Sequence, residues 1–321
     1  MSVLVSAGLK AQALPCPRQT VPVTVSDAKG RMITGLKAVD FGVHVHGHPA
    51  TITNYVVDTG PRRIALVLDA SGSMIKDGGQ WNQTITLAKT LVEGLPREDS
   101  VAFVAFASQV DRKIGFTQDR RPILEELDDL RGGSKVIPKN MRETALWDSA
   151  LEASRLFDLR RVGDAIYIMT DGDDNYSHAS RSDVEGALVA AGVRFFPLLP
   201  PSIDLVGGSR TKGNLDVEAS LETQTRKTLE DVADNTGGAL FTFYDRQING
   251  ARVPFTPGEL GVALKQLSAL THEFYRLEIE LPQPNDKNRD WKIEVVDPIR
   301  KDKSTLVARY PHKLTPCDAR P

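Results

Sequence analysis

The chain has 321 residues, and its 40 basic and 42 acidic residues leave a formal net charge of −2. That length suits one large domain or two modest ones, and 40% hydrophobic with 26% charged residues is typical of a globular protein. The composition excludes a chain that is disordered throughout, a collagen-like rod and a coiled coil. The balanced charge argues against a nucleic-acid binder that works through bulk electrostatics. No apolar run approaches the roughly 20 residues of a membrane-spanning helix.

The start of the chain resembles the end of a signal peptide. Residues 3–9 are apolar, and Ala11-Gln12-Ala13 has the form of a cleavage site, although the basic residues that open a signal peptide are missing. A floppy apolar tail is the alternative interpretation. We predict a truncated signal peptide over residues 1–17 and an extracytoplasmic protein, either periplasmic or secreted.

Short strands separated by turns are expected over residues 18–58. Val21, Val23 and Val25 share one face of the first strand, and further strands are predicted over residues 41–45 and 52–57. So few residues cannot bury an adequate core of their own. These strands therefore need a partner elsewhere in the chain.

From Arg62 onward, strands alternate with helices, which indicates a doubly wound, mostly parallel α/β sheet. Continuous apolar runs predict strands over 64–68, 101–107, 165–169, 193–199 and 240–244, with an edge strand over 110–116. Helices are expected over 87–94, 122–130, 146–156, 184–191, 229–233 and 257–272. The polar stretch over residues 201–219 is expected to be a mobile insert.

The β pattern returns after the last helix, with strands expected over 275–281, 291–296 and 305–310 and a turn at 284–287. We infer that these strands pack against the N-terminal ones in a small β-sandwich into which the α/β domain is inserted. The predicted boundaries are 18–58 and 274–315 for the two parts of the sandwich, 60–272 for the inserted domain and 316–321 for a tail.

Two cysteines, Cys16 and Cys317, lie near opposite ends of the chain. No CxxC pair exists, which excludes a zinc ribbon or a thioredoxin-like motif. The cysteines are either unrelated or joined in a disulfide, which needs an oxidising compartment. The split sandwich would bring them to the same end of the molecule and favours the disulfide, which would contribute roughly 4–5 kcal/mol on the chain-entropy model.

Polar oxygen donors follow the buried strands. The first strand ends in Asp69-Ala70-Ser71-Gly72-Ser73-Met74, and the third ends in Asp171. At the carboxyl end of a parallel strand the chain turns, so side chains two residues apart can converge there. Carboxylates and hydroxyls suit Mg²⁺, Mn²⁺ or Ca²⁺, and Thr144, just before a helix, could add a third hydroxyl. The alternative is that these residues only cap helices and form turns.

These segments resemble a known metal site. Asp69-x-Ser71-x-Ser73, Thr144-Ala145-Leu146 and Thr170-Asp171-Gly172 are similar to the metal-ion-dependent adhesion site (MIDAS) of von Willebrand factor A (VWA) domains. The resemblance covers about residues 60–272 and implies a Rossmann-like fold. It also implies that Ser71, Ser73 and Thr144 contact the metal, and that Asp69 and Asp171 bind it directly or through water. The flanks, around 35–43 and 308–311, resemble the VWFA-related domain described from acidobacteria.

The predicted function is a non-enzymatic adhesion module that engages a partner protein's Glu or Asp through the metal. Gly72, Met74, Asp173 and Asp174 are expected to form a rim that contacts this partner. A cytoplasmic VWA subunit of an AAA+ ATPase machine is an alternative, against which the terminal cysteines argue. A metal-dependent hydrolase is a weaker one, because the sequence places no His, Lys or Cys beside the metal ligands.

Two other sets of residues have a simpler interpretation. His44, His46 and His48 alternate, so on one strand they would share a face that zinc could use. We favour a solvent-facing set, with Val43 and Val45 pointing inward. Trp81, Trp147 and Trp291 are expected to pack in the core rather than to form a ligand site.

Overall fold

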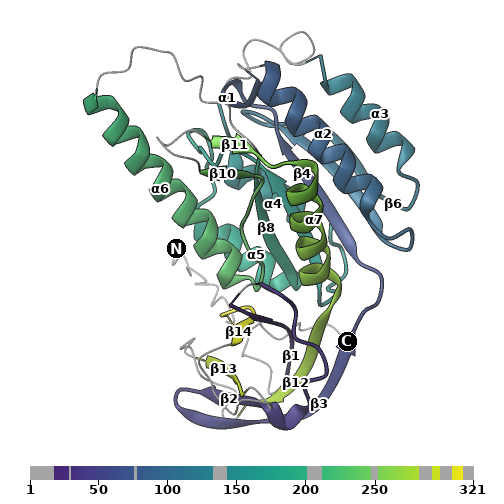
Figure 1. Ribbon diagram of the computed structural model, residues 1–321. Coiled ribbons are helices and arrows are strands. Elements are labelled where there is room, and N and C mark those ends of the chain that lie inside the picture. The colour runs from purple at the N-terminus through teal and green to yellow at the C-terminus, as the bar shows by residue number, and fades with distance from the viewer. Residues whose placement is uncertain are drawn as a thin grey trace, which may run out of the picture.

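A computed structural model describes residues 18–28, 30–75, 78–132, 143–200, 212–246, 252–281, 291–296 and 306–313. In these residues two six-stranded sheets account for most of the strands, and a two-stranded ribbon accounts for the rest. The mostly parallel sheet carries helices on both faces, and the antiparallel sheet lies at one end of the molecule, where N-terminal and C-terminal strands come together (Figure 1). No helix in the described ranges is long and apolar enough to cross a membrane.

The sheet of the α/β domain is mostly parallel, as predicted. Its strand order is β6-β5-β4-β7-β8-β9. The parallel strands are β4 (Arg63–Asp69), β5 (Ser100–Phe106), β7 (Asp164–Met169), β8 (Val193–Leu199) and β9 (Phe241–Thr242), and β6 (Val110–Thr117) is an antiparallel edge strand. The central strands are buried on both faces, which explains their uninterrupted apolar sequences.

Helices cover both faces of this sheet. They are α1 (Gly72–Ile75), α2 (Gly78–Gly94), α3 (Arg121–Leu130), α4 (Leu146–Ser154), α5 (Arg181–Ala191), α6 (Lys212–Asn235) and α7 (Pro257–His272). One core joins α2, α3 and α7 to strand residues such as Leu66, and the other joins α4, α5 and α6 to strand residues such as Val67. Alternate residues of β4 therefore serve opposite faces of the sheet.

The start of α7 agrees with the prediction from sequence, and the start of α6 does not. α7 begins where expected, because Thr256 caps it, Glu259 completes a capping box and Pro257 stands in the first turn. α6 begins at Lys212, so the expected insert over 201–219 is wrong for its second half. Lys212, Leu215, Glu218 and Ala219 in this stretch favour a helix, although the stretch as a whole is polar. Residues 201–211 lie outside the described ranges.

The two ends of the chain build one antiparallel sheet, so the predicted pairing of N- and C-terminal strands is confirmed. Its order is β13-β2-β3-β12-β1-β14. The strands are β1 (Arg18–Asp27), β2 (Phe41–Val45), β3 (His48–Asp58), β12 (Phe274–Glu280), β13 (Trp291–Val295) and β14 (Leu306–Arg309). The end strands approach each other, because Ile293 N donates to Tyr310 Oη at 3.1 Å. The strands form one continuously bonded sheet, and a separate second layer, as in a sandwich, is not confirmed.

The histidines, tryptophans and cysteines were also the subject of predictions. Val43 and Val45 are buried as predicted, but the three histidines do not share a strand. His44 lies in β2, His46 lies in the following turn with a φ of 50°, and His48 begins β3. The three tryptophans are buried. Cys16, Cys317 and the predicted turn at 284–287 lie outside the described residues.

Candidate metal centre

Three loops meet at the carboxyl end of the parallel sheet. The loop after β4 rests on the end of β5, because Ala70 N donates to Phe106 O at 2.7 Å. The loop before α4 rests on the same strand end, because Ala145 N donates to Ala107 O at 2.8 Å. The loop after β7 then contacts the loop before α4 through Asn175. The fold therefore brings the segments that carry Asp69, Thr144 and Asp171 together, although they are far apart in sequence.

The carboxylate of Asp69 is fully buried and firmly oriented. Its Oδ1 accepts a hydrogen bond from Ser71 N at 2.9 Å, and its Oδ2 accepts one from Thr170 Oγ1 at 2.7 Å. Gly172 N in turn donates to Thr170 Oγ1 at 2.9 Å. Thr170 therefore links the two acidic loops, a role that the sequence did not reveal.

Negative charge accumulates at this point without a counter-charge. Burial, followed by the neighbouring charge of Asp171, raises the pKa of Asp69 to about 7, although hydrogen bonds from Ser71 and Thr170 oppose the shift. Within the described residues, no basic side chain forms an ion pair with either carboxylate. A cation at this position would remove the repulsion, so the residues present fit a metal ion.

Hydroxyl groups supply the other donors. Ser71 Oγ and Ser73 Oγ are 3.1 Å apart, with Ser71 buried and Ser73 exposed, so the pair reaches from the interior to the surface. Thr144 is also buried, at 2% exposure. The described residues contain no cluster of three or more His, Cys, Asp or Glu side chains that could hold a metal. The candidate site therefore depends on hydroxyl oxygens as much as on carboxylates, which suits Mg²⁺ better than zinc.

Asn175 holds the Thr144 segment in place. Thr144 N donates to Asn175 Oδ1 at 2.8 Å, and the backbone N–H groups of Asn175 and Tyr176 both donate to Thr144 O at 3.1 Å. Thr144 is thus fixed to the loop that carries Asp171. This role of Asn175 was not predicted, because the only signal in the sequence is an Asn in a turn-rich segment four residues after Asp171.

The residues of the predicted rim differ in accessibility. Gly72 is half-buried and Asp173 is exposed, and the pKa of Asp173 is raised by partial burial and by the charge of Asp171. Met74 is fully buried in the core, so its place in the rim is wrong: the single turn of α1 directs this side chain inward.

Asp174 is exposed, but its carboxylate accepts hydrogen bonds that hold neighbouring segments together. Its Oδ1 accepts hydrogen bonds from Leu146 N at 3.0 Å and from Ser177 Oγ at 2.6 Å. These bonds satisfy a free N–H at the start of α4. Asp174 therefore ties the loop after β7 to the helix that follows Thr144.

Gly172 allows α6 to approach the acidic loop. Its φ is +94°, and a Cβ atom there would lie 2.5 Å from Thr225 Cγ2 in α6. Both the backbone conformation and the close contact therefore require glycine at this position. The Asp171 loop is held between the sheet and α6.

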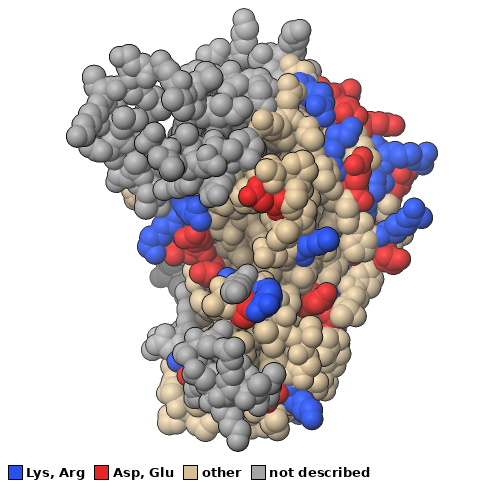
Figure 2. Space-filling view, viewed as in Figure 1, with Lys and Arg blue, Asp and Glu red and all other residues tan. Residues whose placement is uncertain are grey.

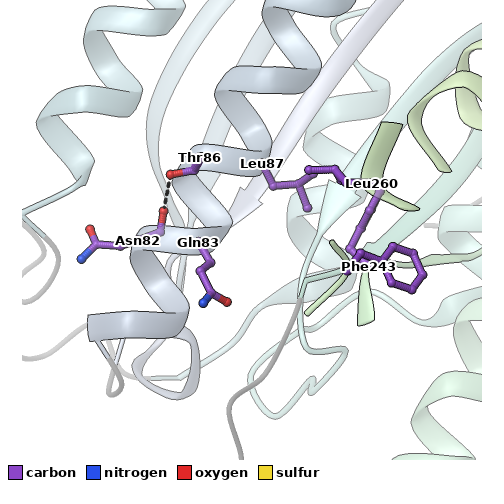
Figure 3. A pocket seen from close by; sticks show the side chains of 7 residues that line it. Asn82, Gln83, Thr86, Leu87, Phe243 and Leu260 are labelled. Atoms are coloured by element: carbon purple, nitrogen blue, oxygen red, sulfur yellow. Dashed lines mark hydrogen bonds between the residues drawn. The ribbon is translucent and has the colours of Figure 1, made fainter. Parts of the chain in front are cut away.

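The candidate metal centre is distinct from a cavity on the flank of α2. That cavity measures about 280 Å³ and is lined by Asn82, Gln83, Thr86, Leu87, Phe243, Phe255 and Leu260. Figure 3 shows Leu87 and Leu260 directed toward each other from α2 and α7, with Phe243 beside them. Its walls are mainly apolar and include none of the candidate metal ligands.

The fold and the loops at its carboxyl edge define a Rossmann-like α/β domain. The family model for the von Willebrand factor type A domain matches residues 64–235, just over half of the chain. The chain therefore belongs to the VWA family, whose members are typically protein-interaction or adhesion modules and are usually not enzymes.

Comparison with solved structures finds distant similarity. BatB from Bacteroides thetaiotaomicron is 18% identical, with a TM-score of 0.44 over 65% of this chain and 98% of that chain. An aerotolerance-related membrane protein from Bacteroides fragilis is 18% identical, with a TM-score of 0.43 over 64% and 98%. Proximal thread matrix protein 1 of the mussel byssus is 21% identical, with a TM-score of 0.45 over 70% and 50%. A search of curated proteins finds no match. At these levels of similarity the neighbours add no argument about function.

Proposed function

We propose that this protein is an adhesion module that binds a partner protein through a divalent metal, Mg²⁺ with Mn²⁺ or Ca²⁺ as alternatives. The proposed ligands are Asp69, Ser71, Ser73, Thr144 and Asp171. The observation that carries the proposal is the buried carboxylate of Asp69, which stands beside Asp171 with no basic side chain paired to either in the described residues. Such a pair is costly unless a cation compensates it.

The donor set also explains why a partner would be acidic. Mg²⁺ prefers six oxygen ligands and exchanges its water slowly, so a protein site usually leaves positions for water or an incoming ligand. When bound, the metal would supply a positive charge at the surface, next to the exposed Ser73. A Glu or Asp of the partner would complete the shell of ligands. We infer binding rather than catalysis as the function of this site.

The proposal also covers the location of the protein, the state of its cysteines and its relationship to a subfamily. We infer an extracytoplasmic location, a disulfide between Cys16 and Cys317 and a relationship to the acidobacterial VWFA-related domain. The pairing of β1 with β14 supports the disulfide alone, because β1 begins at Arg18, close in sequence to Cys16, and β14 ends at Arg309, before Cys317. Peptide mapping under non-reducing conditions would test the disulfide.

Calorimetric titration of Mg²⁺, Mn²⁺ and Ca²⁺ tests the metal site. We expect the wild type to bind one equivalent, and Asp69→Asn and Ser73→Ala to lose or weaken that binding. Asp69→Asn keeps the shape of the buried side chain, and Ser73→Ala changes an exposed one, so neither is expected to unfold the protein. Asp173→Asn removes a nearby charge that is not a proposed ligand and serves as the matched control.

The outcomes separate the proposal from its alternatives. Metal binding that disappears in the two ligand variants and persists in the control supports the site. A wild type that binds none of the three metals contradicts it. A metal-loaded wild type that hydrolyses phosphate or carboxylate esters, with the same variants inactive, would favour the hydrolase instead.

A further inference from the structure

Two stretches of chain connect the α/β domain to the antiparallel sheet, and Asp99 binds both of them. One stretch runs from β3 to β4 through Arg62, and the other runs from α7 to β12 through His272. Asp99 Oδ1 accepts a hydrogen bond from Arg62 N at 2.7 Å, and Asp99 Oδ2 lies 2.7 Å from His272 Nε2. One carboxylate therefore holds both connections, one with each oxygen.

The imidazole ring of His272 has an acceptor at each of its nitrogens. Nδ1 lies 2.9 Å from the carbonyl oxygen of Ser268, one turn earlier in α7, and Nε2 faces Asp99. A carbonyl oxygen can only accept a hydrogen bond, and so can an ionised carboxylate. A neutral imidazole has one N–H group, whereas the imidazolium ion has two. Both hydrogen bonds can therefore form only when the site holds one proton more than a neutral ring supplies.

The extra proton belongs to the imidazole rather than to the carboxylate. Asp99 Oδ1 already accepts from Arg62 N, so a proton on Asp99 would have to lie on Oδ2, in the same bond to Nε2. A carboxylic acid gives up its proton more readily than an imidazolium ion does. The guanidinium group of Arg120 donates to the main-chain oxygen of Asp99 at 2.8 Å, and a nearby cation favours the ionised carboxylate. The contact is therefore an ion pair between His272 and Asp99.

The charges around this ion pair are buried, unlike those at the molecular surface. Figure 2 shows basic and acidic side chains interspersed over α2, α3 and β6, where water and salt screen them. Asp99 is inaccessible to solvent, and the His272 side chain is 13% exposed. The charged and titratable groups that face the pair from neighbouring elements are Asp58, Arg62, Arg120, Tyr167 and Arg194. In such surroundings a single hydrogen bond contributes more than it does at the surface.

Loss of the proton leaves one acceptor without its donor. The neutral ring keeps its N–H on Nε2, because a buried carboxylate is costlier to leave unpaired than a carbonyl oxygen. The unprotonated Nδ1 then faces the carbonyl oxygen of Ser268, and the two electron-rich atoms repel each other. Ser268 Oγ lies 3.4 Å from Nδ1, which is long for a hydrogen bond from a hydroxyl group. This hydroxyl therefore replaces the lost bond only poorly.

We propose that His272 and Asp99 form a pH-sensitive clasp at the point where α7 continues into β12. In the protonated state the clasp ties the last turn of α7 to the start of β5, and the same carboxylate holds the start of β4 through Arg62 N. As the pH rises and the proton leaves, the α7 side loosens and the Arg62 side stays bound. Protonation and the closed clasp favour each other, so the clasp stabilises the fold fully at acidic pH and its contribution is lost as the pH rises.

Urea unfolding at a series of pH values from about 5 to about 8 tests the clasp, because histidines titrate in this range. His272→Gln supplies an N–H donor that does not titrate, and its comparison with the wild type cancels the pH dependence of Asp69, which both proteins share. We expect the unfolding equilibrium constant of the variant, relative to the wild type, to be roughly tenfold larger at about pH 5 than at about pH 8. His48→Gln, at the exposed start of β3, is the control and should give the same ratio at every pH. A ratio for His272→Gln that does not change with pH would overturn the proposal.

Nitrogen NMR of the imidazole ring, combined with hydrogen exchange, locates the change. We expect the His272 resonances, identified by their absence in His272→Gln, to show two protonated nitrogens at about pH 5 and one at about pH 8. The protection of Glu273 N–H, which donates to Ala269 O at 2.8 Å, should fall over the same pH range. Arg62 N–H is the internal control, because its bond to Asp99 is kept. A ring that carries a single proton at about pH 5, or an equal loss of protection at Arg62 and Glu273, would contradict the clasp.

Discussion

The two ends of the parallel sheet both hold buried charge, but they balance it differently. At the carboxyl end, Asp69 and Asp171 stand together with no basic partner in the described residues. At the amino end, Arg194 is 1% exposed and donates to the carbonyl oxygens of Leu270, Thr271 and Gly163 at 2.7, 2.6 and 2.9 Å. Three carbonyl oxygens thus accept hydrogen bonds from the Arg194 guanidinium, although its Nε has no partner in the described residues and burial lowers its pKa to about 9.

The partner of Arg194 is the end of a helix. Leu270 and Thr271 lie in the last turn of α7, where carbonyl groups carry partial negative charge. Arg62 donates to the next carbonyl, His272 O, at 3.1 Å. The ring of Phe274 lies between the two guanidinium groups, 4.4 Å from Arg62 and 4.7 Å from Arg194. The amino end is therefore a structural joint between α7 and the antiparallel sheet, whereas the proposed function assigns a cation to the carboxyl end.

Replacement of Arg194 gives the largest expected effect. Arg194→Met leaves three buried carbonyl groups without their donor, so we expect the free energy of unfolding to fall by about 2–4 kcal/mol. Urea unfolding measures the loss, and Arg131→Met, an exposed change in the same residue type, is the control. Mg²⁺ affinity should not change in either variant. A weakened Mg²⁺ affinity in Arg194→Met would show that the two ends are coupled.

The pH dependence of metal binding is the next largest effect. Because the pKa of Asp69 is raised to about 7, the metal-free folded protein keeps a proton there that the unfolded chain loses near the ordinary aspartate value of 3.8. Raising the pH between these values therefore destabilises the metal-free fold and strengthens Mg²⁺ binding. We expect affinity to rise by about fiftyfold from about pH 5 to about pH 7. Titrations in buffers of different ionisation enthalpy should show proton release, and binding independent of pH would contradict the assignment.

Asn175 should have a smaller effect on the same site. Asn175→Ala removes the side-chain bond to Thr144 N, so the Thr144 hydroxyl loses its fixed position. Loss of a residue that orients a ligand typically weakens metal binding at least about tenfold. Calorimetry with Mg²⁺ measures the change, and Asn82→Ala, an exposed change in α2, is the control. If stability falls while Mg²⁺ affinity stays the same, Asn175 holds the loop but does not position a metal ligand.

The sequence predicted the regular parts of both regions better than their polar contacts. Strands such as β4 were predictable because burial on both faces imposes an apolar run, and α7 was predictable from Thr256 and Pro257 at its start. Met74 was misassigned because its neighbours in sequence carry polar donors, whereas the turn of α1 points it inward. Asn175 and Arg194 act on residues 31 and 76 positions away. Contacts between residues so far apart in sequence depend on how the helices and strands pack, which a local sequence pattern does not predict.

The smallest effect is expected at an exposed contact between His178 and Asp148 of α4. His178 Nδ1 lies 3.2 Å from Asp148 Oδ2, but the histidine side chain is 88% exposed. Asp148 also accepts backbone hydrogen bonds from His178 N at 3.0 Å and Ala179 N at 2.7 Å, and these do not depend on the imidazole. His178→Ala should therefore change the free energy of unfolding by less than about 0.5 kcal/mol. Asp148→Ala removes the backbone contacts too and should cost about 1 kcal/mol. Equal losses in urea unfolding would mean that the side-chain pair, not the backbone bonds, holds this loop against α4.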